Sequence, residues 1–294
     1  MTKKKLGRGV TVFLFLLPAL ALFVGILIAP IFMSTYYSFF DWNGFGDKTF
    51  IGLSNYTELF SSKAIGFVKA LRNSVLLAVL SVFIQLPLSL ALAIVLGKGK
   101  TKGERAYLSI YFLPVLISTV VIGQLWLKIY NPDYGILNVF LRAIGAEGAT
   151  QIWLGDVKTA LIAVFVPTLW QYVGYHMLLM YAGVKGVSPE LLEAARIDGA
   201  TEWQVSRYIV IPSIKPILRV SVIFAVTGSL KSFDLIYVLT NGGPLHATEV
   251  PSTIMINMLF QRNRYGMGSS IAVMLILLCF VFALLINRAF KERD

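Results

Sequence analysis

Six long apolar segments constrain what this chain can fold into more than any other feature of its sequence. They cover residues 10–33, 75–96, 107–127, 160–184, 217–239 and 269–287. A helix rises about 1.5 Å per residue, so about 20 residues cross a hydrocarbon core of about 30 Å. Only 14% of the 294 residues are charged, compared with about 25% in soluble domains. The sequence therefore predicts an all-α integral membrane protein with six transmembrane helices.

The first apolar segment has the basic start of a secretory signal peptide, supplied by Lys3, Lys4, Lys5 and Arg8. The apolar core of a signal peptide has about 7–15 residues, whereas this run has 24. We therefore expect an uncleaved helix. Residues 1–9 are then a cytoplasmic tail, and 10–294 form a single transmembrane domain.

Basic residues predict the orientation in the membrane. If the N-terminus is cytoplasmic, the segments on the cytoplasmic side hold 16 of the 26 Lys and Arg residues. Cytoplasmic segments of membrane proteins carry an excess of Lys and Arg, so both termini are expected in the cytoplasm. The net charge of +11 gathers at the ends of the spans rather than on a soluble module, so no nucleic-acid partner is expected.

The sequence contains no complete motif for nucleotide binding, metal binding or catalysis. The segment 97–101, GKGKT, resembles the end of a phosphate-binding P-loop, but Ile94 stands where the motif needs glycine. His176 and His246 are the only histidines and do not form a ligand cluster, and Cys279 is the single cysteine. We therefore expect no metal, no cofactor and no catalytic site, and an enzyme is the weakest interpretation.

The fifth apolar segment carries two charges, Lys231 and Asp234. In one helix, residues three apart share a face, and charges at this depth need a partner or a water-filled cavity. Two interpretations remain open: an ion pair at the membrane rim, or the polar wall of a translocation path. The small residues Gly228, Ser229 and Ser232 suit either the path or close helix packing.

The fourth apolar segment contains Pro167 and Gly174, which can bend or interrupt a transmembrane helix near a binding region. Aromatic rings and hydrogen-bonding groups lie around them, and these match the C–H faces and hydroxyls of a sugar: Trp170, Gln171, Tyr172, Tyr175 and His176. The third segment adds Ser118, Thr119 and Gln124. Ordinary helix packing is the alternative for each of them.

The polar stretch 188–212 separates the fourth and fifth segments. Ser188, followed by Pro189 and an acid, predicts a helix start, and Gly199 predicts its end. Thr201 and Gln204 fit a capping box that opens a second helix, which we expect to end near residue 209. Such a hairpin could rest on lipid headgroups or pack closely against another protein.

The same stretch resembles the EAA loop of binding-protein-dependent ABC importer permeases. The resemblance rests on Glu193-Ala194-Ala195, then Gly199, then Ile209, Ile211 and Pro212. The family commonly has leucine where this chain has Ile211. The segments FIGLSNYTELF, NPDYGILN and FDLIYVLTNGGP are similar to the sugar-importing branch, specifically to the larger maltose-transporter permease, which has two further N-terminal spans.

The resemblance implies a type I ABC importer permease (MetI-like) fold with a coupling loop at about 188–216. It also implies a second homologous permease subunit, two ATP-binding ABC subunits, an extracytoplasmic solute-binding protein, a sugar substrate and a bacterial or archaeal cytoplasmic membrane. The residues implied in ATPase coupling are Glu193, Ala194, Ala195, Asp198, Gly199, Ile209 and Pro212. Those implied in sugar contact are Ser118, Trp170, Gln171, Tyr172, Tyr175, Ser229 and Ser232, to which our own interpretation adds Lys231 and Asp234.

Two rival functions remain. An importer of a phosphate-bearing solute such as glycerol phosphate should place Arg or Lys in its cavity, and the spans offer only Lys231. A stand-alone secondary carrier should work without an ATPase and needs no docking loop.

Overall fold

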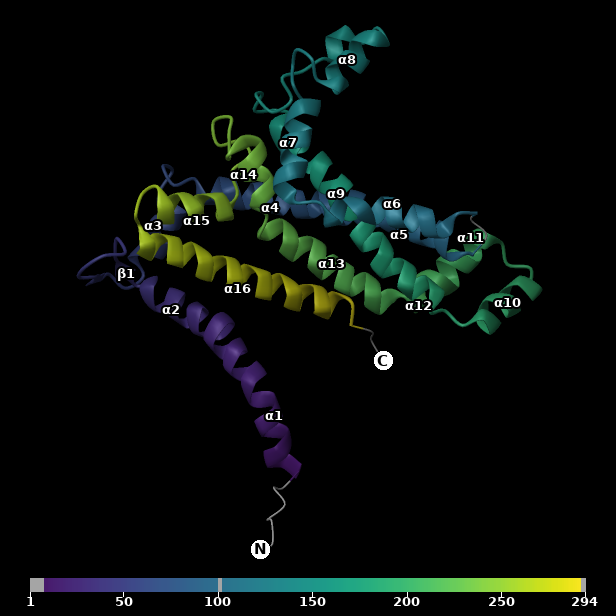
Figure 1. Ribbon diagram of the computed structural model, residues 1–294, viewed down its shortest axis with the longest axis horizontal. Coiled ribbons are helices and arrows are strands. Elements are labelled where there is room, and N and C mark those ends of the chain that lie inside the picture. The colour runs from purple at the N-terminus through teal and green to yellow at the C-terminus, as the bar shows by residue number, and fades with distance from the viewer. Residues whose placement is uncertain (1–7, 100–101, 292–294) are drawn as a thin grey trace, which may run out of the picture. The chain divides into compact units, whose positions relative to one another are not determined.

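The computed structural model describes residues 8–99 and 102–291, most of which are helical (Figure 1). They form two compact units. Unit one contains the residues up to Ser62 together with Met255–Met274, and unit two contains Lys63–Ile254 together with the residues from Leu275 onward.

Unit one begins with a continuous apolar helix made of α1 (Arg8–Phe23), η1 (Val24–Ile28) and α2 (Ala29–Tyr37). Two short strands, β1 (Phe40–Asp41) and β2 (Thr49–Phe50), pair antiparallel after it, and α3 (Ser54–Ser61) follows. The unit also receives most of α15 (Pro251–Phe260) and the start of α16 (Tyr265–Ala289).

Hydrogen bonds and an ion pair hold the segments of unit one together. The buried amide of Asn55 donates to the carbonyl oxygens of Ser38 and Phe40, at 2.8 and 3.0 Å. Arg264 donates two hydrogen bonds to the Glu58 carboxylate, at 2.8 and 2.6 Å. These bonds with Arg264 hold the pKa of Glu58 below its ordinary value and raise the pKa of Arg264.

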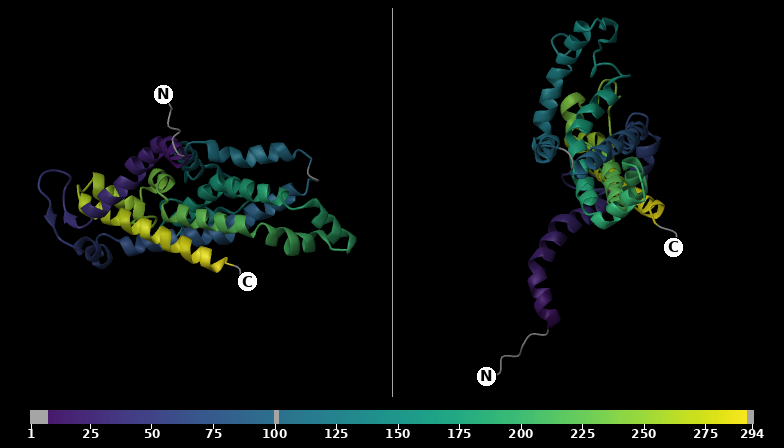
Figure 2. Two further views of the ribbon diagram at one scale, coloured as in Figure 1. Left: turned by 90° about the horizontal axis from the view of Figure 1, so that it is seen from below. Right: turned by 90° about the vertical axis from the view of Figure 1, so that its right-hand side faces the viewer.

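Unit two is built from helices. In chain order they are α4 (Phe67–Leu80), η2 (Ser81–Gln85), α5 (Leu86–Gly97), α6 (Glu104–Leu116), α7 (Thr119–Ile129), α8 (Ile136–Ala143), η3 (Glu147–Ala149), α9 (Ala160–Lys185), α10 (Pro189–Ile197), α11 (Glu202–Val205), η4 (Ser206–Val210), α12 (Ile211–Ser213), α13 (Lys215–Leu230) and α14 (Asp234–Thr240). The hairpin of α10 and α11 projects beyond the end of α9 (Figures 1 and 2).

Helix α9 is the centre of unit two. It packs along α5 and α6, while α13 packs on α4 and α14 on α7. Met177 and Met180 of α9 are fully covered in an apolar cluster with Ala93. A Cβ on Gly174 would overlap the backbone carbonyl of Tyr111, so glycine is what lets α6 approach. Pro167 and Gly174 were expected to bend or interrupt this helix, and the interruption is not found, because α9 runs unbroken through both.

Three helices accommodate a proline in the same way, with a π-helical turn just before it. The π-helical turns η1, η2 and η4 each end two residues before a proline, at Pro30, Pro87 and Pro212. In each turn an N–H bonds five residues back, as from Ile211 to the Ser206 carbonyl. Proline has no N–H and its ring clashes with the carbonyl four residues earlier, and the wider turn makes room for it. The expected helix end near residue 209 is therefore wrong, since helical structure continues to Ser213.

The spans agree with the predicted number, though two of them are bent. Within the described part of the chain, four continuous helices are long and apolar enough to cross a membrane: Val12–Tyr37, Phe67–Gly97, Ala160–Lys185 and Tyr265–Ala289. Two bent pairs bring the total to six if each counts as one span, with bends of 97° between α6 and α7 and 72° between Glu202–Ser213 and α13.

Two predicted helices are broken inside their expected ranges. The third, 107–127, is broken where Ile117 and Ser118 adopt extended backbone angles after Pro114. The fifth, 217–239, ends at Leu230, and α14 begins only at Asp234.

Candidate functional site

A polar cavity of about 370 Å³ lies within unit two. Its walls come from α4 with η2, from α7, α9 and α13, and from the break before α14. Seven of the predicted substrate residues line it: Gln171, Tyr172, Tyr175, Ser229, Lys231, Ser232 and Asp234.

Two predicted substrate residues lie elsewhere. Ser118 precedes α7 at the bend, and its neighbour Thr119 lines the cavity instead. Trp170 meets Trp126 edge to face, with ring centroids 6.2 Å apart. Trp170 is therefore part of an aromatic cluster rather than of the cavity wall.

The α9 wall combines an amide with two phenol rings. Gln171, Tyr172 and Tyr175 reach the cavity because three and four residues make about one helical turn. Gln171 is only 2% exposed, and its amide nitrogen donates to the Thr119 hydroxyl at 3.3 Å. Its carbonyl oxygen has no hydrogen-bond partner among the described residues.

The two charged wall residues belong to different helices. Lys231 caps the end of α13, where its N–H bonds the Thr227 carbonyl at 3.1 Å, and Asp234 begins α14. The expectation that they share a face of one helix is therefore wrong. The break exposes both side chains at the cavity, which thus has one cation and one anion beside neutral hydroxyl, amide and ring groups.

The second span contributes a wall that the sequence interpretation missed. Ser81 and Gln85, both in η2, line the cavity, and the Ser81 hydroxyl lies 3.3 Å from that of Ser229 on α13. A usable signal was present, because a glutamine inside an apolar segment is costly unless it serves a site. Thr168 and Thr227 also line the cavity and carried no distinctive signal.

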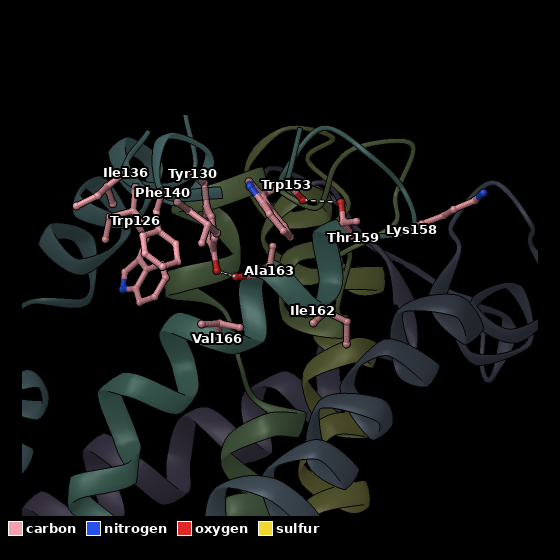
Figure 3. Close-up of a pocket in the computed structure, with 12 residues that line it drawn as sticks. Trp126, Tyr130, Ile136, Phe140, Trp153, Lys158, Thr159, Ile162, Ala163 and Val166 are labelled. Carbon is pink, nitrogen blue, oxygen red and sulfur yellow. Dashed lines mark hydrogen bonds between the residues drawn. The ribbon is translucent and has the colours of Figure 1, made fainter. Parts of the chain in front are cut away.

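A second, larger cavity of about 770 Å³ opens between α7, α8 and the start of α9 (Figure 3). Its lining is mostly apolar and includes the aromatic rings of Trp126, Tyr130, Phe140 and Trp153. It offers few groups that could bind the hydroxyls of a solute, so the smaller polar cavity is the better candidate for a solute site.

The loop beside this apolar cavity is fixed by one buried amide. Asn138 accepts a hydrogen bond from the Trp153 indole at 2.8 Å and donates to the Gln151 carbonyl at 2.9 Å. The same amide nitrogen donates to the carbonyl of Pro132 at 3.2 Å. Asn138 therefore ties together a loop that contains little regular structure.

The second candidate region is the hairpin of α10 and α11. The predicted capping box is confirmed: the Gln204 N–H donates to the Thr201 hydroxyl at 3.3 Å, and the Thr201 N–H donates to the Gln204 side chain at 2.7 Å. Gly199 has the expected left-handed conformation, with φ +78°. The Ser188 hydroxyl bonds to Glu190 rather than to the helix backbone, and it holds the pKa of Glu190 below its ordinary value.

The hairpin has a buried face and an exposed face. Ala195 and Ile209 pack on an apolar cluster that includes Val184 and Val205. The other predicted coupling residues are exposed: Glu193, Ala194, Asp198, Gly199 and Pro212. Two large apolar side chains are also open, Ile197 at 86% and Trp203 at 72% exposure. An exposed apolar surface of this kind suits a protein partner.

Among the described residues, one ion pair joins the hairpin to the end of α5, a second lies within the hairpin, and a third joins α9 to α6. Glu202, at the start of α11, lies 3.3 Å from the Lys98 amine and 3.6 Å from the Arg196 guanidinium. Lys185, at the end of α9, lies 3.1 Å from Glu104. The hairpin is therefore attached by packing and charge to the helices that carry the polar cavity.

Sequence comparison identifies relatives along nearly the whole chain. A family model described as "Binding-protein-dependent transport system inner membrane component" matches residues 64–292. The probable ABC transporter permease protein YurN of Bacillus subtilis is 40% identical over 95% of both chains. The diacetylchitobiose uptake system permease protein NgcF of Streptomyces coelicolor is 35% identical over 94% of this chain and 81% of its own length.

Structure comparison agrees on the fold. The crystal structure of a bacterial ABC transporter involved in the import of the acidic polysaccharide alginate contains a chain that superposes with a TM-score of 0.83. The two chains are 24% identical, and the match covers 96% of each.

Proposed function

We propose a sugar-transport function for this chain, which belongs to the family of binding-protein-dependent transport system inner membrane components and has the type I ABC importer permease (MetI-like) fold. The chain is one of two homologous permease subunits. Together they form the path of a mono- or oligosaccharide that an extracytoplasmic binding protein delivers. Separate ATP-binding subunits drive transport, and the chain itself is not an enzyme.

The polar cavity carries the proposal that the solute is a sugar. Its lining is mostly neutral, with the amide of Gln171, the hydroxyls of Ser229 and Ser232, and the rings of Tyr172 and Tyr175. Rings match the C–H faces of a pyranose, and amides and hydroxyls match its OH groups. The 35% identity to a diacetylchitobiose uptake permease supports the same substrate class.

The hairpin of α10 and α11 is the proposed coupling element. Its exposed Glu193, Ala194 and Gly199 form a narrow surface with little side-chain bulk for an ATPase groove. Its flanking apolar residues Ile197 and Trp203 add contact area. The excess of Lys and Arg on the same side supports a cytoplasmic hairpin and cytoplasmic termini.

The hairpin is connected directly in the chain to two helices of the polar cavity. It joins the end of α9 to the η4–α12–α13 segment, and α9 and α13 are two walls of the polar cavity. A force on the hairpin therefore reaches both walls within one chain. This supports a mechanism in which ATP-driven movement of the docked subunits opens and closes the cavity.

Reconstitution of the complete transporter tests this function. Proteoliposomes containing both permeases, the ATPase subunits and the binding protein are supplied with neutral mono- and oligosaccharides, and with glycerol 3-phosphate in parallel. ATP-dependent uptake of a neutral saccharide supports the proposal. Uptake of glycerol 3-phosphate alone, or uptake that needs no ATPase, contradicts it.

A further inference from the structure

One end of the polar cavity contains His176, which the sequence favours for sugar binding but which the family resemblance does not include among its sugar contacts. Along α9, His176 lies five residues beyond Gln171 toward the hairpin, which is a displacement of about 7.5 Å. It lines the cavity together with Gln85 and Phe224. This end is distinct from the opposite end, where Thr119 and Asp234 lie.

The His176 imidazole is buried and lacks a partner. The residue is 4% exposed, and its Nδ1 has no hydrogen-bond partner among the described residues. Its ring meets Tyr175 edge to face, with centroids 5.3 Å apart, and Tyr175 in turn lies 6.4 Å from the Phe224 ring. The aromatic rings therefore hold the imidazole in place and leave its polar atom unused.

Gln85 lines the same cavity from another helix. It is 2% exposed and is the last residue of the π turn η2. Single π turns inside α-helices are frequent at functional sites, because they re-aim side chains. Ser81, one turn earlier, adds a hydroxyl next to Ser229.

Burying such groups has an energetic cost. A buried polar atom left without a hydrogen bond costs about 1–3 kcal/mol. The carbonyl oxygen of Gln171 and Nδ1 of His176 both lack partners among the described residues, and both residues line the cavity. A hydroxyl-bearing solute would supply a partner to Gln171 at the first wall and to His176 at this end.

We propose that Gln85 and His176 form a second, neutral subsite that binds sugar hydroxyls at the hairpin end of the cavity. The proposal rests on the sugar-transport function above. The sugar moves from the wall formed by Gln171 and Tyr172 to this subsite before release. In this conformation Nδ1 of His176 is buried. It becomes accessible to the solute when α9 and α13 move apart.

The test uses the complete transporter with His176→Phe, His176→Gln and Gln85→Leu. His176→Phe keeps a flat ring without hydrogen-bonding groups, and His176→Gln restores them. We expect His176→Phe and Gln85→Leu each to lower the maximal uptake rate about tenfold, because each removes a hydroxyl partner. The concentration of loaded binding protein at half-maximal uptake should change less than about twofold. His176→Gln should recover most of the rate.

Two controls separate the possible failures. Co-purification of all subunits and ATPase stimulation by the loaded binding protein should be retained in each variant. Wild-type uptake by His176→Phe and Gln85→Leu overturns the subsite, as does a loss that appears equally in His176→Gln. A wild-type complex that transports no saccharide instead contradicts the proposed function.

Discussion

The hydroxyl of Tyr130 on the α7 side donates a 2.9 Å hydrogen bond to the carbonyl oxygen of Ala163 on α9. Pro167, four residues beyond Ala163, has no N–H, so this carbonyl lacks its helical partner. The phenol therefore replaces a main-chain donor that proline removed (Figure 3). An apolar environment makes such replacement necessary.

Replacing Tyr130 by Phe should destabilise the protein by about 1–2 kcal/mol, because the Ala163 carbonyl is left unsatisfied. Pro167→Ala restores a main-chain donor. Adding it to Tyr130→Phe should therefore reduce the loss of stability. Thermal unfolding in detergent measures both effects, with Tyr134→Phe at an exposed position as the control. Purely additive effects of the two changes would show that the phenol does not serve this carbonyl.

Replacing Gly199 by Val should reduce uptake about tenfold, since a β-branched residue resists a positive φ. No atom outside its immediate neighbours lies within 4 Å of the position of a Cβ on Gly199, so strain rather than crowding within the chain is the cause. Gly199→Asn should lose less of the uptake activity, because asparagine tolerates a positive φ.

Gly46 offers a matched control for that experiment. It also has a positive φ, +63°, and no atoms within 4 Å of a Cβ, but it lies in the loop between β1 and β2. Gly46→Val should keep ATPase coupling. Equal uptake by Gly199→Val and Gly46→Val would contradict a special role for the hairpin.

Replacing Gly174 by Ala should destabilise unit two by about 1–3 kcal/mol, because the added methyl group overlaps the Tyr111 carbonyl and pushes α6 away. Gly25 is the control, since nothing lies within 4 Å of a Cβ there. Unfolding temperatures of the two alanine variants give the comparison. A Gly174→Ala variant as stable as wild type would show that α6 and α9 are not in close contact.

The ion pair of Glu58 with Arg264 should make stability depend on pH. Because the pKa of Glu58 is lowered by Arg264 from its ordinary value of 4.5, its contribution is complete above that pH. It is then lost as the pH falls through the lower, folded-state pKa. Both side chains are partly exposed, so the pair is worth less than about 1 kcal/mol.

The difference in unfolding temperature between wild type and Glu58→Gln should therefore be constant from neutral pH down to about 5 and vanish in stronger acid. Glu147→Gln, at an exposed position, should show no such trend. A difference that persists unchanged into strong acid would argue against the pair.

The charge of Lys231 distinguishes the two substrate classes. Lys231→Met should retain uptake of a neutral saccharide within about threefold, because hydroxyls do not need a cation. Tyr175→Ala should weaken the same uptake by about tenfold through loss of a ring face, with assembly intact. Loss of transport in Lys231→Met with normal uptake in Tyr175→Ala would indicate an anionic solute.

The sequence supported the overall architecture because long apolar segments and helix caps are local signals. The capping box of Thr201 with Gln204 and the left-handed Gly199 depend on neighbours within a few residues, and both are confirmed. The family fold was likewise accessible from the spacing around Glu193.

What the sequence could not supply depends on contacts between distant segments. The break between Lys231 and Asp234 lies inside a long, predominantly apolar segment, so hydropathy predicts a single helix there. Gly174 and Pro167 suggested an interruption, but packing against α6 and the Tyr130 hydroxyl preserve the helix. Gln85 carried a signal as a polar residue in an apolar segment, but its place in the wall of the cavity depends on how the second span packs beside α9 and α13.

The π turns before Pro30, Pro87 and Pro212 also alter the angular register of these helices. A π turn holds one extra residue, so every side chain beyond it is rotated by about 100° from where a regular helix would place it. In the second span this offset separates α4 from α5. A helical wheel drawn from Phe67 therefore assigns the wrong face to Ser89, which bonds the Val173 carbonyl of α9 at 2.9 Å. Deleting the extra residue from η2 would leave Ser89 facing α9, whereas inserting a further residue there would turn that contact, and the whole of α5, away from its neighbour.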